Sequence, residues 1–212
     1  MICLPKVTKD HKRKRKAEIA EAARKIFIQK GFEQTTMTDV VNFTGFSRGS
    51  VYQYFSSTDE MFRFLTDQSD SGFENTIQTL LQKHGSAWNA IDEYLAAIQE
   101  NFIDNELGFG IVQFEYFINS ARKEERANYL LTRYNSAVKS FSDLIHHGIQ
   151  NGEFKPIQPV EAIVLFFINV TDGLLMQRLL TINILPPSKV YVSEQLEGLK
   201  IYLKQVLQFH KE

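Results

Sequence analysis

The spacing of apolar residues is the feature that most limits the folds open to this chain. Near the N-terminus, Ile19, Ala22, Ala23, Ile26 and Phe27 recur three and four positions apart. Residues spaced in this way share one face of an α-helix. Helix-breaking residues are scarce, with 11 glycines and 5 prolines in 212 residues, and no alternating run predicts a strand. The pattern therefore predicts an all-α protein.

About nine helices are expected, with breaks where glycine, proline or a capping residue interrupts the pattern. Their expected ranges are 11–30, 37–44, 48–55, 58–83, 86–104, 107–119, 122–151, 159–182 and 190–210. Thr36 and Asp39 have the spacing of a capping box, and Gly45 and Ser47 separate the second helix from the third. Short helices separated in this way are typical of a helix-turn-helix motif.

Charge is distributed unevenly along the chain. Residues 1–60 carry 11 Lys and Arg against 7 Asp and Glu, a net charge of +4, whereas the remainder carries 13 against 18, a net charge of −5. The excess is concentrated in KDHKRKRK, residues 9–16. A basic N-terminal segment on an otherwise acidic chain favours contact with a polyanion such as nucleic acid. Basic runs are also common in solvated tails.

The third expected helix has two different faces on a helical wheel. Val51 and Phe55 share one face and are expected to be buried, while Gln53 lies opposite, with Tyr52 and Tyr54 on either side of it. This arrangement suits a helix lying in the major groove of DNA, where Arg48 can pair with guanine and Gln53 with adenine. The tyrosine hydroxyls can then donate to phosphates. The alternative is that both tyrosines are half-buried core rings.

The expected DNA-binding residues come from the basic arm, the second helix and the third helix. They are Lys12, Arg13, Thr36, Thr38, Ser47, Arg48, Gly49, Ser50, Tyr52, Gln53 and Tyr54.

Residues 19–62, IAEAARKIFIQKGFEQTTMTDVVNFTGFSRGSVYQYFSSTDEMF, resemble the TetR family of bacterial transcriptional regulators. The shared elements are an Ala-Ala helix ending in Gly-Phe, a Thr-Thr pair, a short helix, and a Tyr-x-x-Phe-type recognition helix. Val41, Thr44 and Phe46 stand where the family usually has smaller residues, and Thr58 stands where a lysine is common. The basic residues Lys12–Lys16 are expected to compensate for that missing phosphate contact.

The resemblance implies two domains and a homodimer on a near-palindromic DNA operator. A DNA-binding domain is expected over residues 1–58, with a basic arm over 1–16, and a regulatory and dimerisation domain over 59–212. The last two long helices are expected to supply the dimer interface through Ile163, Phe167, Val170, Leu174, Leu196, Leu199 and Leu203. For each of these residues, packing in the core of its own chain is an equally good alternative.

The resemblance also implies a small-molecule effector that releases DNA. The expected effector pocket is aromatic with a few polar groups, and suits an apolar or cationic ligand. Its candidate residues are Phe102, Phe109, Phe114, Tyr116, Phe117, Asn169 and Asp172, for which ordinary core packing is the alternative. An activator, or a regulator controlled by a protein partner, remains an alternative to a ligand-released repressor.

Other protein classes are disfavoured. The chain lacks the sequence motifs of nucleotide-binding enzymes, hydrolases and zinc proteins, so neither an enzyme nor a cofactor is expected. His146 and His147 point about 100° apart on a helix, so no metal site is expected there. A single cysteine, Cys3, excludes an internal disulfide and favours the cytoplasm. The most apolar stretch, AIVLFFINV, is far shorter than the roughly 20 residues of a membrane-spanning helix.

Overall fold

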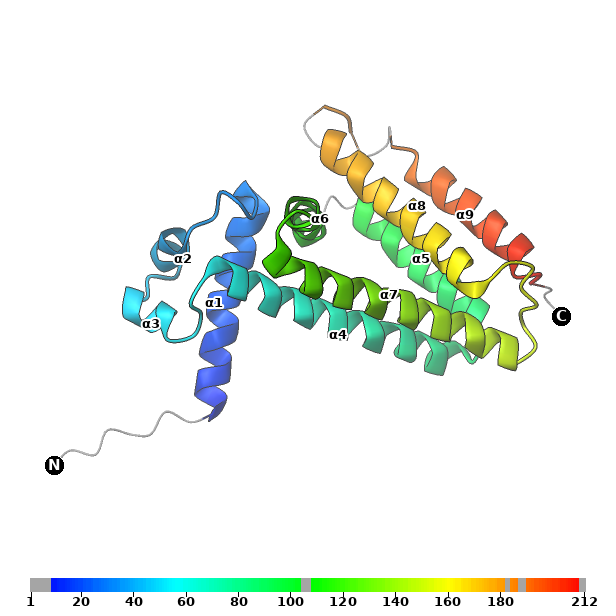
Figure 1. Cartoon of the computed structure of the whole chain (residues 1–212), viewed down its shortest axis with the longest axis horizontal. Coiled ribbons are helices and arrows are strands. Elements are labelled where there is room, and N and C mark those ends of the chain that lie inside the picture. Colours follow the sequence, from blue (N-terminus) through cyan, green and yellow to red (C-terminus); the bar gives the residue numbers. More distant parts are fainter. Residues whose placement is uncertain (1–8, 104–107, 182–183, 187–189, 210–212) are drawn as a thin grey trace. The chain divides into compact units, whose positions relative to one another are not determined.

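A computed structural model describes residues 9–103, 108–181, 184–186 and 190–209. Every regular element within these ranges is a helix, which confirms the all-α prediction (Figure 1). The helices are α1 Lys9–Lys30, α2 Met37–Thr44, α3 Arg48–Tyr52, α4 Thr58–His84, α5 Ala87–Ile103, α6 Gly108–Ser120, α7 Glu124–Gln150, α8 Val160–Thr181 and α9 Val192–Val206.

The chain forms two compact units that divide between Ser69 and Asp70. This division lies inside α4, because the helix that begins at Thr58 continues without a break to His84. The expected boundary at residue 58 coincides with the start of that helix.

The first unit is built around the apolar face of α1. Ile19, Ala23 and Phe27 are buried on that face, as their spacing predicts. Measured between ring centroids, Phe32 lies 5.5 Å from Phe27 and 5.2 Å from Phe62. Phe62 lies near the start of α4. Gly31 has a φ of 79°, a left-handed conformation that lets the chain turn back at the end of α1.

Capping residues fix the two short helices. The hydroxyl of Thr36 accepts a hydrogen bond from the N–H of Asp39, whose carboxylate accepts one from the N–H of Thr36, so the predicted capping box is confirmed. Ser47 caps α3 by accepting from the N–H of Ser50 at 3.2 Å. The helix ends at Tyr52 and not at Phe55 as expected, because a turn begins at Gln53.

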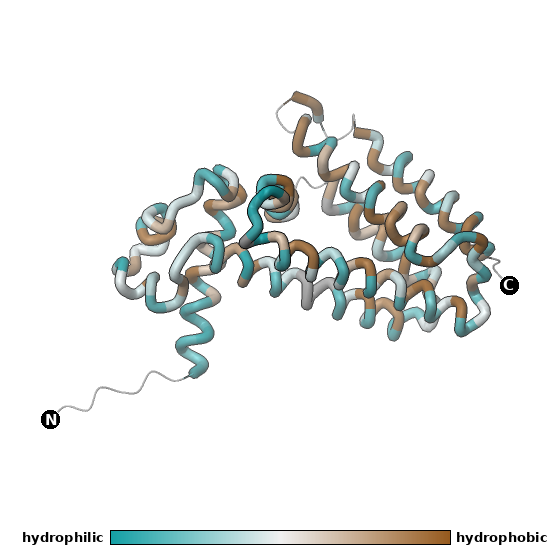
Figure 2. The backbone as a smooth tube through the Cα atoms, viewed as in Figure 1, coloured by the Kyte–Doolittle hydropathy of each residue, from teal (hydrophilic) through white to brown (hydrophobic). Residues whose placement is uncertain are grey.

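The second unit packs α5, α7, α8 and α9 around a shared apolar core. Figure 2 shows hydrophobic and hydrophilic positions interleaved along these helices, in contrast to the hydrophilic first turns of α1. The carboxylate of Glu153, between α7 and α8, accepts from the N–H groups of Ala87 and Trp88 at 2.9 and 3.1 Å and from the Ser86 hydroxyl at 2.9 Å. Glu153 thereby caps the start of α5.

Helix α8 has the length and composition of a membrane span, with 22 residues and a mean hydropathy of 1.5 over an 18-residue window. The expectation drawn from its short uninterrupted apolar run missed this property. In this unit α8 packs against α7 and α9, with Ile163, Phe167 and Leu174 in the core. It also carries Asp172 and a buried Arg178. Core helices of soluble proteins share this composition.

Candidate DNA-binding surface and effector cavity

Val51 of α3 is buried as the helical wheel predicts, whereas Gln53, Tyr54 and Phe55 lie beyond the end of the helix. Val51 and Phe55 are buried, so the opposite side of α3 faces outward. Arg48, Gly49, Tyr52, Gln53 and Ser47 are exposed, while Ser50 and Tyr54 are half-buried. The exposed surface combines one cationic, two small and several hydrogen-bonding side chains, which are the groups that read base edges and hold phosphates.

Arg48 rests on Tyr52 one helical turn away. Its Nη2 lies 3.4 Å from the Tyr52 hydroxyl, and its guanidinium carbon lies 5.3 Å from the centre of the Tyr52 ring. Both side chains are exposed, so the contact holds Arg48 weakly and leaves it able to reach outward.

Thr36 and Thr38 begin α2, and both are exposed. The Thr36 hydroxyl also donates to Asp39 Oδ2 at 2.6 Å, so its oxygen and its proton are both used within the capping box. Lys30 Nζ lies 2.7 Å from the same carboxylate oxygen. Hydrogen bonds from Lys30 and then from Thr36 lower the pKa of Asp39 to about 2. Thr38 is the freer of the two threonines to meet DNA.

The basic run forms the first turns of α1, since the helix begins at Lys9. Residues 1–8 of the expected arm lie outside the described residues. Lys12 and Arg13 are exposed, and Arg13 also pairs with Asp10 at 3.5 Å. Arg15 and Lys16 are half-buried instead.

A cavity of about 380 Å³ lies among α6, α7 and α8 in the second unit. Its lining includes three of the expected pocket residues, Phe114, Phe117 and Asp172. The complete lining is Gly110, Gln113, Phe114, Phe117, Leu130, Arg133, Tyr134, Ala137, Ile168, Asp172 and Leu175.

The other four expected pocket residues do not line this cavity. Phe102, Phe109 and Tyr116 are buried, but none of them is among the residues that line the cavity. Asn169 is exposed on α8.

Arg133 of α7 and Asp172 of α8 both line this cavity. The guanidinium carbon of Arg133 lies 4.8 Å above the ring of Phe117. Burial raises the pKa of Asp172 above its usual range. Burial first, and then the charge of Asp172, raise the pKa of Tyr94 on α5 to about 12. Sequence analysis missed Arg133, because a lone arginine in an amphipathic helix resembles a solvated residue.

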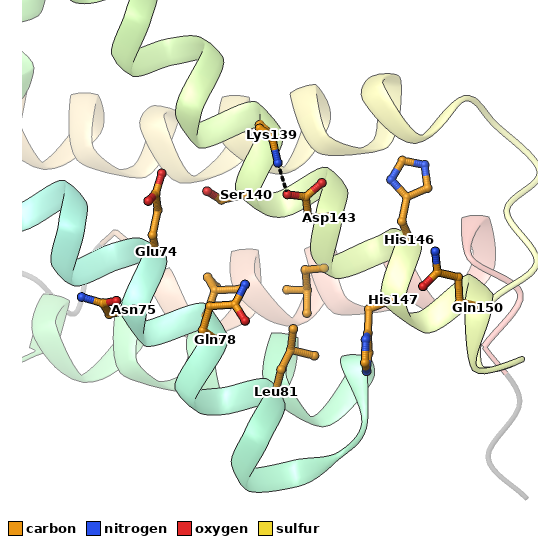
Figure 3. Close-up of a pocket in the computed structure, with 12 residues that line it drawn as sticks. Glu74, Asn75, Gln78, Leu81, Lys139, Ser140, Asp143, His146, His147 and Gln150 are labelled. Atoms are coloured by element: carbon orange, nitrogen blue, oxygen red, sulfur yellow. Dashed lines mark hydrogen bonds and ion pairs between the residues drawn. The ribbon is translucent and has the colours of Figure 1, made fainter.

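A second, polar cleft of about 630 Å³ lies between α4 and α7. Figure 3 shows the lining side chains, with Glu74 and Gln78 on α4 and Lys139, Asp143, His146 and His147 on α7. Lys139 donates to Asp143, and Ser136 donates to Glu74 at 2.7 Å. No cluster of metal-ligating side chains occurs among the residues that the structure describes.

Six of the seven residues expected at a dimer interface lie in the core of the second unit. They are Ile163, Phe167, Leu174, Leu196, Leu199 and Leu203. Their side chains contact other helices of the same chain and so do not face outward. Val170 is half-buried. The large apolar side chains that α8 and α9 leave exposed are Phe166, Met176, Leu180 and Ile201.

Comparison with known proteins agrees with this arrangement. A profile described as bacterial regulatory proteins of the tetR family matches residues 19–64, and one described as a tetracyclin repressor-like C-terminal domain matches residues 90–183. The uncharacterized HTH-type transcriptional regulator YfiR of Bacillus subtilis is 46% identical over 205 residues, covering 96% of this chain and 97% of that protein. The chain belongs to the TetR family. It is therefore a helix-turn-helix transcriptional regulator, and the family is one of regulators rather than enzymes.

More distant TetR relatives and structures share the fold. The repressor KstR2 of Mycobacterium tuberculosis is 24% identical over 162 residues, which cover 74% of this chain and 78% of that protein. A TetR regulator from Chloroflexus aurantiacus has a TM-score of 0.73 at 18% identity, covering 92% of this chain and 97% of its own. The regulator FadR of Bacillus subtilis, solved in complex with stearoyl-CoA, has a TM-score of 0.68 at 16% identity, covering 92% and 99% of the two chains.

Proposed function

We propose that this TetR-family protein is a cytoplasmic repressor that binds a near-palindromic DNA operator as a homodimer and is released by a small molecule. The observation that carries the proposal is the outward face of α3, where Arg48, Tyr52 and Gln53 are exposed while Val51 is buried. The relative KstR2 is named as a repressor, which supports that direction of regulation.

On DNA, each exposed group has a distinct role. Arg48 pairs with guanine and Gln53 with adenine, because those side chains match the hydrogen-bonding edges of those bases. Tyr52 and Tyr54 donate to phosphates on either side of the groove, and Lys12 and Arg13 add phosphate contacts. Gly49 and Ser50 are small enough for the backbone to approach the bases.

The second copy of the chain covers the exposed side of α8 and α9. The rings of Phe166 on α8 and Tyr202 on α9 lie 4.1 Å apart between centroids, so an apolar surface continues from one helix to the other. A Cβ added at Gly173 or Gly198 would meet no atom within 4 Å, which leaves room for close approach by another helix. The two α3 helices of the dimer then bind half-sites about 34–36 Å apart, or slightly more.

The effector occupies the cavity among α6, α7 and α8. A volume of about 380 Å³ lies within the range of small-molecule sites. The rings of Phe114, Phe117 and Tyr134 favour an apolar or aromatic body, and Asp172 favours a cationic or hydrogen-bond-donating group on it. Such a ligand shifts the protein towards release only if it binds the released state more tightly than the DNA-bound state.

Fluorescence anisotropy tests this proposal with the duplex upstream of the protein's own gene and a scrambled duplex, each at two salt concentrations. Tight binding that favours the native duplex at both concentrations is expected. Equal, salt-labile binding to both duplexes would contradict sequence-specific reading of that site.

Arg48→Ala is the variant that tests base reading. It should relax the preference at one base of each half-site, at a cost of about 1–3 kcal/mol. A uniform loss across all sequences would make Arg48 a phosphate contact instead.

A further inference from the structure

The reading helix α3 has too few residues to be stable by itself. It spans five residues, and of these only Val51 is buried. An isolated helix of this length does not persist in water, because the first turn costs more conformational entropy than its hydrogen bonds return. Neighbouring side chains therefore have to hold α3 in place.

Two aromatic rings bracket α3 in the sequence. Phe46 precedes the helix cap, and Phe55 follows the turn after Tyr52. Phe55 is buried and packs edge-on against Phe64 of α4, with the ring centroids 5.5 Å apart.

Consecutive cations of α1 cover both of these rings. The guanidinium carbon of Arg15 lies 4.3 Å from the centre of the Phe46 ring. The Lys16 ammonium lies 4.9 Å from the centre of Phe55 and 4.7 Å from that of Phe64. All three distances fall within the range of cation–π attraction, about 6 Å.

The surroundings of these cations differ from those of the other basic residues nearby. Arg15 and Lys16 are half-buried, whereas Lys12, Arg13 and Lys14 are exposed. Arg15 Nη1 also lies 3.3 Å from Glu18 Oε2, so a carboxylate already balances its charge. A cation between a ring and a carboxylate is poorly placed to reach a phosphate.

We propose that Arg15 and Lys16 are positioning residues that hold the two ends of α3, through Phe46 on one side and Phe55 on the other, and that neither contacts DNA. This inference rests on the proposed reading of DNA by α3. It divides the basic run between two roles, with Lys12 and Arg13 meeting phosphates and the next two cations ordering the reading helix.

A double-mutant cycle on operator binding tests the inference, with Arg15→Gln, Phe46→Leu and both together. Each single change should weaken operator binding about threefold to tenfold, because fewer molecules hold α3 in the binding geometry. The double variant should be no weaker than the weaker single, since both changes remove the same contact. Phe46→Leu keeps an apolar side chain at this half-buried site, and Phe46→Tyr, which keeps the ring, should bind like the unmodified protein.

The salt dependence of binding separates positioning from phosphate contact. Arg15→Gln and Lys16→Gln should leave the slope of log affinity against log salt unchanged, whereas the control Lys12→Gln should reduce it by about one. A reduced slope for Arg15→Gln, or additive losses in the cycle, would overturn the inference. A failure of the proposed function is distinguishable from these outcomes. In that case the unmodified protein would bind operator and scrambled DNA equally well.

Discussion

Replacing Gly148 with alanine puts a methyl group into space that the Phe154 ring already fills. A Cβ at Gly148 would lie 2.2 and 2.3 Å from Cδ2 and Cε2 of Phe154, and 3.0 Å from the Cβ of Ala87. Carbon atoms pack at about 3.5–4.0 Å, so the ring has to move by about 1.5 Å.

The Phe154 ring has little freedom to make that movement. It is 4% exposed, and the N–H of Phe154 donates to the carbonyl of Gly148 at 3.2 Å. Overpacking of this kind costs about 1–3 kcal/mol, and the better helix propensity of alanine offsets up to about 1 kcal/mol. We expect a net loss of about 1–2 kcal/mol in the free energy of unfolding, which lowers Tm by about 2–8 °C in a chain of this length.

Urea unfolding followed by circular dichroism measures this loss, at one fixed protein concentration because the proposed dimer would make the stability depend on concentration. Gly110→Ala in α6 is the matched control, since its Cβ would meet no atom within 4 Å. It should raise the stability by up to about 1 kcal/mol. A Gly148→Ala variant as stable as the unmodified protein would refute the steric reasoning, and the cost should shrink when Phe154 is also changed to leucine.

Three further predictions concern stability and assembly. Glu153→Gln should lower the free energy of unfolding by about 1–3 kcal/mol because it weakens the α5 cap, while the exposed Glu161→Gln should change it little; urea unfolding measures both. Asp39 has its pKa lowered from 3.8 to about 2, so its stabilising effect is present above pH 3.8 and lost as pH falls towards 2. Thermal unfolding against pH should show this loss, and Asp39→Asn should remove it. Phe166→Glu and Ile201→Glu should give monomers by light scattering, and dimers would exclude this face.

The helices and their caps were largely predictable, because they depend on neighbours in the sequence. Both kinds of local signal appear where expected. They are the capping box formed by Thr36 and Asp39 and the left-handed glycine, Gly31, that ends α1. The end of α3 was not predictable in this way. The chain turns after Tyr52, and Phe55 is buried against Phe64 of α4 and beneath Lys16 of α1, neither of which belongs to α3.

The candidate cavity and the buried faces of α8 and α9 were predicted less well, because periodicity identifies a buried face without indicating which residues cover it. Leu196 and Leu203 have the spacing of an interface, yet their own chain covers them. Phe114 and Tyr116 are both aromatic residues of α6, but only Phe114 lines the cavity, since side chains two positions apart face different sides of a helix. Which side is hollow depends on how α7 and α8 pack, and the sequence pattern does not contain that information.

The construction of α3 has a consequence for how this regulator can evolve. The stability of α3 and its proposed recognition of bases depend on different residues. Val51 is buried in the core, while Arg48, Gly49 and Tyr52 remain exposed. Substitutions at the exposed positions therefore cost little folding energy, typically within about 0.5 kcal/mol. A duplicated gene could change its target sequence by one or two point mutations while each intermediate stays folded. Proteins descended from this chain can therefore come to recognise different operators through single substitutions.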